Sequence, residues 1–230
     1  MPNEDSAISI VIPAFNEEMR IRETILSYAK EFPGQEILVI CDGNDNTNHI
    51  VTDLMIENKN IRLLGFHERL GKGGALVAGF KAAKGEKIGF VDADESVKPE
   101  DLKNMFKSLN YIDGVIASRR LRTSRILKEQ PIARRMASRS FNMLVRILFG
   151  LPFKDTQCGA KVFNGKALRD IISDLKTTGF EIDVEILWKL RNKGYEIMEY
   201  PITWTHSEDS KFRLSNSKDM LFSLLKIRFK

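Results

Sequence analysis

Short apolar runs alternate with helix-patterned segments through the first half of this 230-residue chain, and this order limits the folds open to it. The runs expected to form strands are residues 8–12, ended by Pro13, then 37–41, 61–65, 87–91 and 114–118. The helices expected between them are residues 16–32, 46–58, 73–84 and one that begins at Pro99. Such βαβα order predicts an α/β fold with a mostly parallel, doubly wound sheet flanked by helices.

The second half is less regular but contains two amphipathic segments. Residues 131–149 have a helical pattern with two stripes about opposite each other: Ala137, Phe141, Leu144 and Leu148, and Arg135, Arg139, Asn142 and Arg146. Residues 218–230 are mostly apolar, with a polar stripe of Asp219, Ser223, Lys226 and Lys230. Either segment could pack on the domain or lie on an anionic membrane. The presence of both favours a peripheral membrane protein modestly.

Length and composition indicate one domain over residues 1–230, without a transmembrane segment. No run of about 18 apolar residues is present, and the first residues lack the basic and apolar regions of a secretory signal. Cys41 and Cys158 are the only cysteines, which suits reduced thiols. We therefore expect a cytoplasmic protein, peripheral on the inner face of the membrane.

The net charge of +5 is unevenly distributed. Residues 119–146 hold nine basic residues and one acid, Glu129, for a local charge of +8. A local basic patch predicts a phosphate-bearing partner, such as a lipid headgroup, an acceptor phosphate or nucleic acid. The patch lacks the interleaved aromatics of single-strand binders, and no helix-turn-helix or zinc pattern occurs, so a nucleic-acid-binding module is the weaker alternative.

Two carboxylates, Asp92 and Asp94, directly follow the apolar run 88–91. In open α/β folds, ligands bind at the carboxyl ends of strands. Mg²⁺ and Mn²⁺ take oxygen ligands, typically one or two carboxylates plus substrate phosphates. An Asp-rich turn is the common alternative for such a pattern. Because other segments agree with it, we expect a site for a metal–diphosphate.

Other strand ends carry polar groups as well. Asn16 and Glu17 follow the first strand, where they could also simply start a helix. Asp42 follows the second and could accept from a base or hold a ribose, or form an Asx turn. Gly71-Lys72-Gly73 follows the third, where small residues and a helix N-terminus favour a phosphate. The chain has no Gly-x-Gly-x-x-Gly at its first turn and no Walker motif, which argues against nicotinamide dehydrogenases and P-loop nucleotidases.

Taken in order, these segments resemble the inverting nucleotide-sugar glycosyltransferases of family two, which have the GT-A fold. The matching segments are residues 13–17, 42–43, 71–73, 92–94 and 118–119. In the second half, residues 155–161, 179–185, Arg134, Ser138, Trp204, Ser210 and Lys211 are similar to the polyprenyl-phosphate sugar synthases, above all the dolichyl-phosphate β-glucosyltransferase branch. The mannosyl branch is less similar.

The resemblance implies a role for each matching residue. Pro13, Ala14, Phe15, Glu17 and Asp42 would surround the nucleoside, with Lys72 and Asp92 at the diphosphate. Asp92 and Asp94 would hold Mg²⁺ or Mn²⁺, with Asp94 as the direct ligand. The acceptor phosphate would be bound by Arg119, Arg134, Ser138 and Lys211. Residues 7–120 would form the nucleotide-sugar half of the domain and residues 121–230 the acceptor half.

The expected reaction moves a hexose, glucose from UDP-glucose or mannose from GDP-mannose, to a polyprenyl phosphate. A phosphate monoester is mostly dianionic at neutral pH and needs no general base. A sugar-hydroxyl acceptor would need one, and the candidates are Asp155, Glu181, Asp183 and Glu185. The catalytic candidates are thus Asp94, Arg119 and Asp155.

The sequence also departs from the family pattern at three positions. Cys41 replaces the first Asp of a usual pair, Ser96 replaces a Gln near the metal in mannosyl relatives, and Ala160 replaces an aromatic residue. Many relatives have membrane helices after this domain, and we expect none here. A degenerate transferase that binds without turnover stays possible on these grounds, although the intact Asp92-Ala93-Asp94 argues against it.

Overall fold

The computed structural model describes residues 7–206 and 216–229. A seven-stranded sheet crosses this part of the chain in the order β3-β2-β1-β4-β7-β5-β8. Its strands are β1 (Ile8–Ala14), β2 (Glu36–Cys41), β3 (Ile61–Gly65), β4 (Lys87–Val91), β5 (Gly114–Ser118), β7 (Ala160–Asn164) and β8 (Ile197–Pro201). All neighbours pair in parallel except β7, which is antiparallel to both β4 and β5. The predicted mostly parallel α/β sheet is confirmed.

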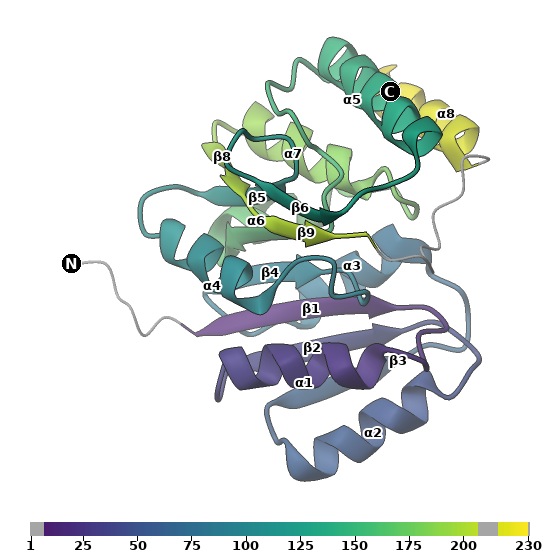
Figure 1. Ribbon diagram of the computed structural model, residues 1–230, viewed down its shortest axis with the longest axis vertical. Helices are drawn as coiled ribbons and strands as arrows, with labels where there is room; N and C mark the ends of the chain where they lie inside the picture. The colour runs from purple at the N-terminus through teal and green to yellow at the C-terminus, as the bar shows by residue number, and fades with distance from the viewer. Residues whose placement is uncertain (1–6, 207–215, 230) are drawn as a thin grey trace.

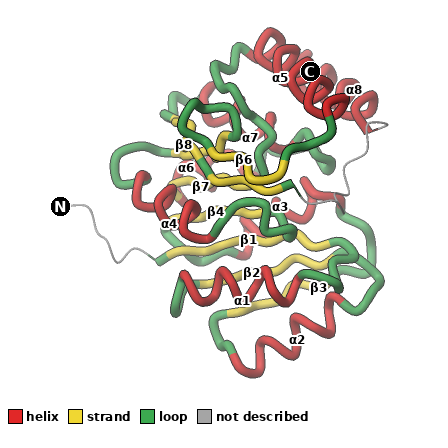
Figure 2. The backbone as a smooth tube through the Cα atoms, in the orientation of Figure 1, coloured by secondary structure: helices red, strands yellow, loops and turns green. Residues whose placement is uncertain are grey.

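Helices cover both faces of this sheet (Figures 1 and 2). One face carries α1 (Ile21–Glu31), α2 (Thr47–Glu57) and α4 (Pro99–Ser108), and the other carries α3 (Gly71–Ala82), α6 (Gly165–Ile172) and α7 (Ile182–Asn192). Two further helices, α5 (Ile132–Phe149) and α8 (Asn216–Phe229), lie side by side beyond α7 (Figure 1). Successive side chains of each buried strand point to opposite faces of the sheet, so they contribute to two apolar cores, one under each helical layer.

The first strand extends through Pro13, where the sequence predicted its end. Pairing with β4 stops at Val11, while pairing with β2 continues to Ala14. Proline therefore falls where the strand has a neighbour on one side only, a position that its missing N–H permits. The first helix also begins later than predicted, at Ile21. Asn16 does not cap it: its φ is +53°, and its Oδ1 accepts from the N–H of Asn44.

Strand β7 was not predicted, although it lies in the middle of the sheet. Its sequence, Ala-Lys-Val-Phe-Asn, has Lys161 at its second position, which interrupts the apolar run. Lys161 is nevertheless fully buried. The short strands β6 (Arg125–Lys128) and β9 (Thr203–Thr205), which pair with each other beside the main sheet, were also missed.

Helix α5 differs from its predicted pattern. Asn142, expected on the polar stripe, is buried and donates to Thr156 Oγ1 at 3.0 Å. The exposed face instead carries an apolar row, each member at least 63 % exposed: Ile132, Met136, Met143 and Ile147. Arg139 and Arg146 are exposed beside this row. Sequence reasoning did not identify this third stripe.

Helix α8 docks on the domain, one of the two arrangements considered for it. Met220 and Leu224 are buried, and Arg228 Nε donates to the Leu148 carbonyl of α5 at 2.9 Å. Phe222 and Phe229 remain more than 70 % exposed. Within the described residues, no helix combines the length and the hydropathy that a membrane crossing requires.

Candidate active site

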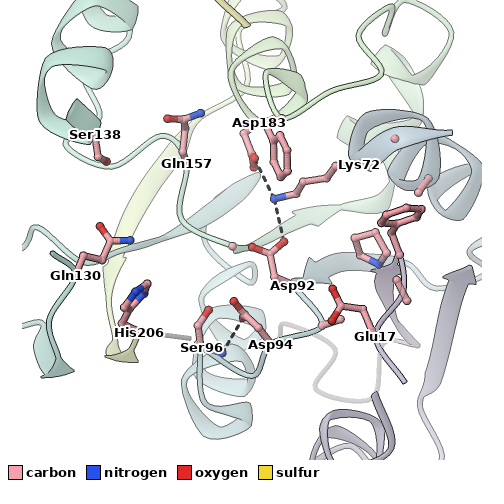
Figure 3. A pocket seen from close by; sticks show the side chains of 18 of the residues that line it. Glu17, Lys72, Asp92, Asp94, Ser96, Gln130, Ser138, Gln157, Asp183 and His206 are labelled. Atoms are coloured by element: carbon pink, nitrogen blue, oxygen red, sulfur yellow. Dashed lines mark hydrogen bonds and ion pairs between the residues drawn. The ribbon is translucent and has the colours of Figure 1, made fainter. Parts of the chain in front are cut away.

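One pocket lies at the carboxyl ends of β1, β2 and β4 and is closed on its far side by α5. All the residues predicted to bind the metal, the nucleotide or the acceptor phosphate line it except Lys211: Pro13, Ala14, Phe15, Glu17, Asp42, Lys72, Asp92, Asp94, Arg119, Arg134 and Ser138. Of the four candidate bases, Asp183 lines it and Asp155, Glu181 and Glu185 do not. The lining residues come from both halves of the chain, and Figure 3 shows the carboxylates and Lys72 gathered at the base of the pocket, with Ser138 across from them. Lys211 lies outside the described residues.

The two metal-site candidates, Asp92 and Asp94, stand where β4 ends. Asp92 N donates to the Gly159 carbonyl at 2.8 Å, and a Cβ on Gly159 would be 2.1 Å from Asp92 Oδ2. Glycine is therefore required beside this carboxylate. Asp94 Oδ1 accepts from the N–H of Ser96 at 3.0 Å (Figure 3). The main chain of residue 96, rather than the side chain that departs from the mannosyl pattern, thus orients the second carboxylate.

The electrostatics of this pair suit a cation. Burial raises the pKa of Asp92; Lys72 opposes that rise, and the nearby Asp94 and Asp183 carboxylates add to it. Within the described residues, no cluster of three or more His, Cys, Asp or Glu is arranged as a metal site. Two carboxylates that share a pocket with room for phosphates nevertheless match the oxygen-donor set of Mg²⁺ or Mn²⁺, since the substrate completes the coordination. The residues present therefore fit the expected metal.

Lys72 reaches the base of the pocket from the first turn of α3. Its Nζ lies 2.9 Å from Asp92 Oδ1 and 3.3 Å from Asp183 Oδ2 (Figure 3). Burial alone would lower the pKa of Lys72, but these two carboxylates raise it, so the side chain remains protonated. A positive charge is thus fixed beside the two carboxylates.

The glycines beside Lys72 have a different use from the one predicted. The N–H groups of Leu70 and Gly71 both donate to Asp42 Oδ2 at 2.9 Å, and Gly73 N donates to the Thr178 carbonyl at 2.8 Å. A Cβ on Gly73 would be 2.4 Å from the Thr177 carbonyl oxygen. These glycines let α3 pack on the 177–178 backbone, and these three amides are already occupied within the protein.

The side of the pocket where a nucleoside is predicted is formed by the turns after β1 and β2. The guanidinium of Arg69 stacks over the ring of Phe15, 3.1 Å from its centroid. Glu17 N donates to Thr47 Oγ1, and the Glu17 carboxylate pairs with Arg20. An aromatic ring and carboxylates placed in this way can hold a planar base and hydroxyl groups.

Arg119 lines the pocket, as predicted for a ligand of the acceptor phosphate, but Asp155 does not lie where a base is predicted. Asp155 is buried behind the Arg119 side chain. Asp155 accepts from the Arg119 backbone N–H and from two nitrogens of its guanidinium. Burial would raise the pKa of Asp155, but the Arg119 charge outweighs that effect and lowers it. Asp155 thus orients Arg119 and does not reach the pocket as a base.

The pocket face of α5 carries the remaining acceptor candidates. Arg134 and Ser138 project from consecutive turns, and Ala137 and Phe141 line the pocket from the same face of the helix. Ser138 Oγ also accepts from Arg120 Nη2 at 2.9 Å. This face lies opposite the exposed apolar row, so one helix presents a cationic side to the pocket and an apolar side to solvent.

Sequence reasoning assigned no role to several pocket residues, although Gln157 lies within the matching segment 155–161. Gln130, Gln157 and His206 line the pocket, and Figure 3 places His206 on the same side as Ser96 and Asp94. His206 stacks on Trp204 with ring centroids 5.8 Å apart. None of these residues stands in a strand-end motif, and His206 is brought to the site by the pairing of β9 with β6 and by the contacts of residues 204–205 with residues 96–97.

Comparisons with known proteins agree with this architecture. The family model described as glycosyl transferase family 2 matches residues 9–172. A dolichyl-phosphate beta-glucosyltransferase of Trichomonas vaginalis is 33 % identical over 95 % of this chain and 70 % of its own length. One from Saccharomyces cerevisiae is also 33 % identical, over 93 % of this chain and 71 % of its own.

A crystal structure of Mycobacterium tuberculosis glucosyl-3-phosphoglycerate synthase, in complex with Mn²⁺, UDP-glucose and phosphoglyceric acid, shares the fold. Its TM-score is 0.72 at 17 % identity, covering 97 % of this chain and 80 % of that one. The family model spans more than half of the chain, and the Asp92-Ala93-Asp94 turn, Lys72 and Arg119 line one pocket. The chain belongs to glycosyl transferase family 2.

Proposed function

We propose that this protein transfers glucose from UDP-glucose to a polyprenyl phosphate of the dolichyl type. One observation carries the proposal: a single pocket has carboxylates and Lys72 at its base and the guanidinium groups of Arg119 and Arg134 on another wall. The first group suits a metal-bound nucleoside diphosphate, and the second suits a separate phosphate. The names of the relatives supply glucose and dolichyl phosphate.

In this proposal the donor lies with its nucleoside between Phe15 and the Glu17–Asp42 side, and with its diphosphate near Lys72. Asp94, with Asp92 beside it, would hold Mg²⁺ or Mn²⁺, whose charge offsets that of the departing diphosphate. Lys72 adds a fixed positive charge at the same place. The similar crystal structure contains Mn²⁺ and UDP-glucose, which supports a metal-dependent UDP-sugar site here.

The acceptor's own oxygen would attack the anomeric carbon in one in-line displacement, with inversion. Arg119, fixed by Asp155, and Arg134 with Ser138 would bind and orient the acceptor phosphate. A phosphate dianion needs no general base. Of the four carboxylates considered as bases, only Asp183 lines the pocket, and it is paired with two lysines. This arrangement supports a phosphate acceptor over a sugar hydroxyl.

A lipid-linked acceptor implies a membrane surface, and we assign it to the exposed faces of α5 and α8. We define the α5–α8 face as Ile132, Met136, Met143, Ile147, Phe222 and Phe229, all more than 60 % exposed. Arg139, Arg146, Lys226 and Arg228 are exposed on the same two helices. Apolar side chains flanked by cations suit the interface of an anionic membrane. The protein would lie peripherally on the inner, cytoplasmic face.

The two halves of the single GT-A domain would then bind different substrates. Residues 7–120 would bind the nucleotide sugar, and the described part of residues 121–230 would bind the acceptor and the membrane. The pocket between them receives side chains from both parts.

The test is donor binding followed by transfer. Thermal stability would be measured with Mn²⁺ and either UDP-glucose or GDP-mannose, on the wild type and on Asp94→Ala. A ligand at about 100 times its Kd stabilises by about 2.7 kcal/mol, which raises Tm by roughly 5–10 °C in a chain of this size. We expect that rise with UDP-glucose only, lost in Asp94→Ala, and glucose transfer to dolichyl phosphate. Binding of GDP-mannose alone, or transfer only to a hydroxyl, would refute the proposal.

A further inference from the structure

Four charged side chains form a continuous row from the centre of the sheet to the base of the pocket. Lys161 Nζ pairs with Asp183 Oδ1 and donates to the Cys158 carbonyl at 2.9 Å. Asp183 Oδ2 in turn lies 3.3 Å from Lys72 Nζ, which is 2.9 Å from Asp92 Oδ1. Figure 3 shows Lys72 bridging the two aspartates. We call this set the Lys161–Asp92 row.

The inner half of this row is costly to bury. Lys161 is fully buried and Asp183 is 2 % exposed. Replacing such a pair by apolar residues of similar volume is often neutral or stabilising, so the pair does not account for the stability of β7. Its direct consequence is orientation: Lys161 holds one oxygen of Asp183, and the other oxygen is left to face Lys72.

The backbone of Lys72 is fixed from the same helix, α7. Glu185 is fully buried and accepts from the N–H groups of Lys176 and Thr177 and from the Thr177 hydroxyl. The turn that it holds packs directly on Gly71 and Gly73, where no Cβ would fit. Helix α7 therefore constrains Lys72 twice, through its main chain and through its ammonium group.

We propose that Lys161 and Asp183 are positioning residues for Lys72, and that Asp183 is not a general base. Asp183 is shared by two lysines, so it anchors the Lys72 ammonium and neutralises it only in part, and Asp92 is the second carboxylate beside it. An incoming diphosphate would thus meet the Lys72 ammonium at a fixed position. This inference rests on the proposed function, in which the donor's diphosphate lies near Lys72.

The test compares UDP affinity by calorimetry, with and without Mn²⁺, in charge-matched variants. Lys161→Met/Asp183→Asn removes one charge of each sign, so no unpaired charge is left buried. We expect its Tm to stay close to that of the wild type and its Kd for UDP to rise about tenfold, the effect of weakening one charge-assisted hydrogen bond. Glu36→Gln/Arg62→Met is the matched control, because it removes an ion pair outside the pocket. Its Kd should not change.

A second arm repeats the measurement in a Lys72→Met background. If Lys161 and Asp183 act through Lys72, their double substitution should have no further effect on Kd there. The conservative variant Lys161→Arg keeps a positive charge beside Asp183, so its affinity for UDP should stay close to that of the wild type. It replaces the double variant in the test if the double variant does not fold. An unchanged Kd in the double variant, or losses that add to that of Lys72→Met, would overturn the inference. A wild-type protein that binds no UDP would refute the donor site itself.

Discussion

Arg119 and Asp155 are joined by two parallel contacts, Nε to Oδ2 at 2.7 Å and Nη2 to Oδ1 at 2.8 Å. A third bond runs from the Arg119 main chain to Asp155 Oδ2. The guanidinium is therefore fixed in plane at the pocket wall, and Nη1 is the nitrogen not bonded to Asp155. Planar, two-point pairing of this kind sets geometry as well as energy.

The first prediction concerns this pair. Asp155→Asn leaves the buried guanidinium without its counter-charge, a loss of about 3–5 kcal/mol, which lowers Tm by roughly 6–20 °C. A general base would behave differently, because its removal would lower kcat and leave Tm intact. Thermal unfolding beside initial rates separates the two roles.

The loss of stability in Asp155→Asn should depend on pH. The pKa of Asp155 is lower in the folded state than its unfolded value of about 3.9. Its stabilising contribution is therefore complete above that unfolded value and is lost as the pH falls through the folded pKa. The Tm difference between wild type and Asp155→Asn should be constant from pH 5 to 8 and shrink below about pH 4. A difference that grows in acid would contradict the assignment.

The second prediction uses Gly159, whose missing side chain leaves room for Asp92. Gly159→Ala would place a Cβ 2.1 Å from Asp92 Oδ2 and push the carboxylate aside. A displacement of about 1 Å can cost about 100-fold in rate, and we expect a loss of that order together with weaker Mn²⁺-dependent UDP binding. Gly34→Ala is the control: at φ +74° it adds backbone strain in open space and should lower Tm without changing UDP affinity.

The third prediction separates the two faces of α5. Arg134→Gln should raise KM for the polyprenyl phosphate by roughly 10–100-fold, the loss of a charge-assisted contact of about 1.5–3 kcal/mol, and leave KM for UDP-glucose unchanged. Arg146→Gln, on the exposed face, should leave both constants unchanged with a short-chain acceptor in detergent. A shift in KM for UDP-glucose would instead place Arg134 on the donor.

The fourth prediction tests the α5–α8 face with vesicles that contain phosphatidylglycerol. Ile132 and Ile147 are 68 % and 70 % exposed, and fully burying an Ile side chain contributes about 1.5–3 kcal/mol. Ile132→Gln/Ile147→Gln should thus weaken partitioning by at least about tenfold. Ile56→Gln, equally exposed but on α2, should leave partitioning unchanged. Equal losses in the two proteins would exclude α5 as the contact surface.

Strands buried on both faces could be predicted from sequence, because they leave a simple apolar pattern. The expected bounds of β4 and β5, whose residues are all buried, match the structure. Those of the edge strand β3 match as well, although Arg62 interrupts its apolar residues. Strand β7 could not be predicted in this way, since Lys161 is neutralised by Asp183, which is 22 residues away in sequence. An ion pair between distant positions leaves no local signal.

Some site residues could be predicted from sequence and others could not, again because some positions depend on contacts between distant residues. Residues at strand ends converge because parallel strands place their carboxyl ends on one edge, and this geometry is readable from sequence order. The position of Asp155 depends on its pairing with Arg119, and that of His206 on a two-stranded pairing beside the main sheet. Both depend on tertiary contacts rather than on a motif.

The antiparallel strand β7 also has a consequence for the order in which the chain can fold. It separates β4 from β5, so a chain synthesised only as far as Ser118 has no neighbour to place on the outer edge of β4. That edge stays open until residues 160–164 emerge from the ribosome, more than forty residues later. An open apolar edge can pair with other chains. Translation speed across residues 119–164 should therefore influence how much of the protein escapes aggregation.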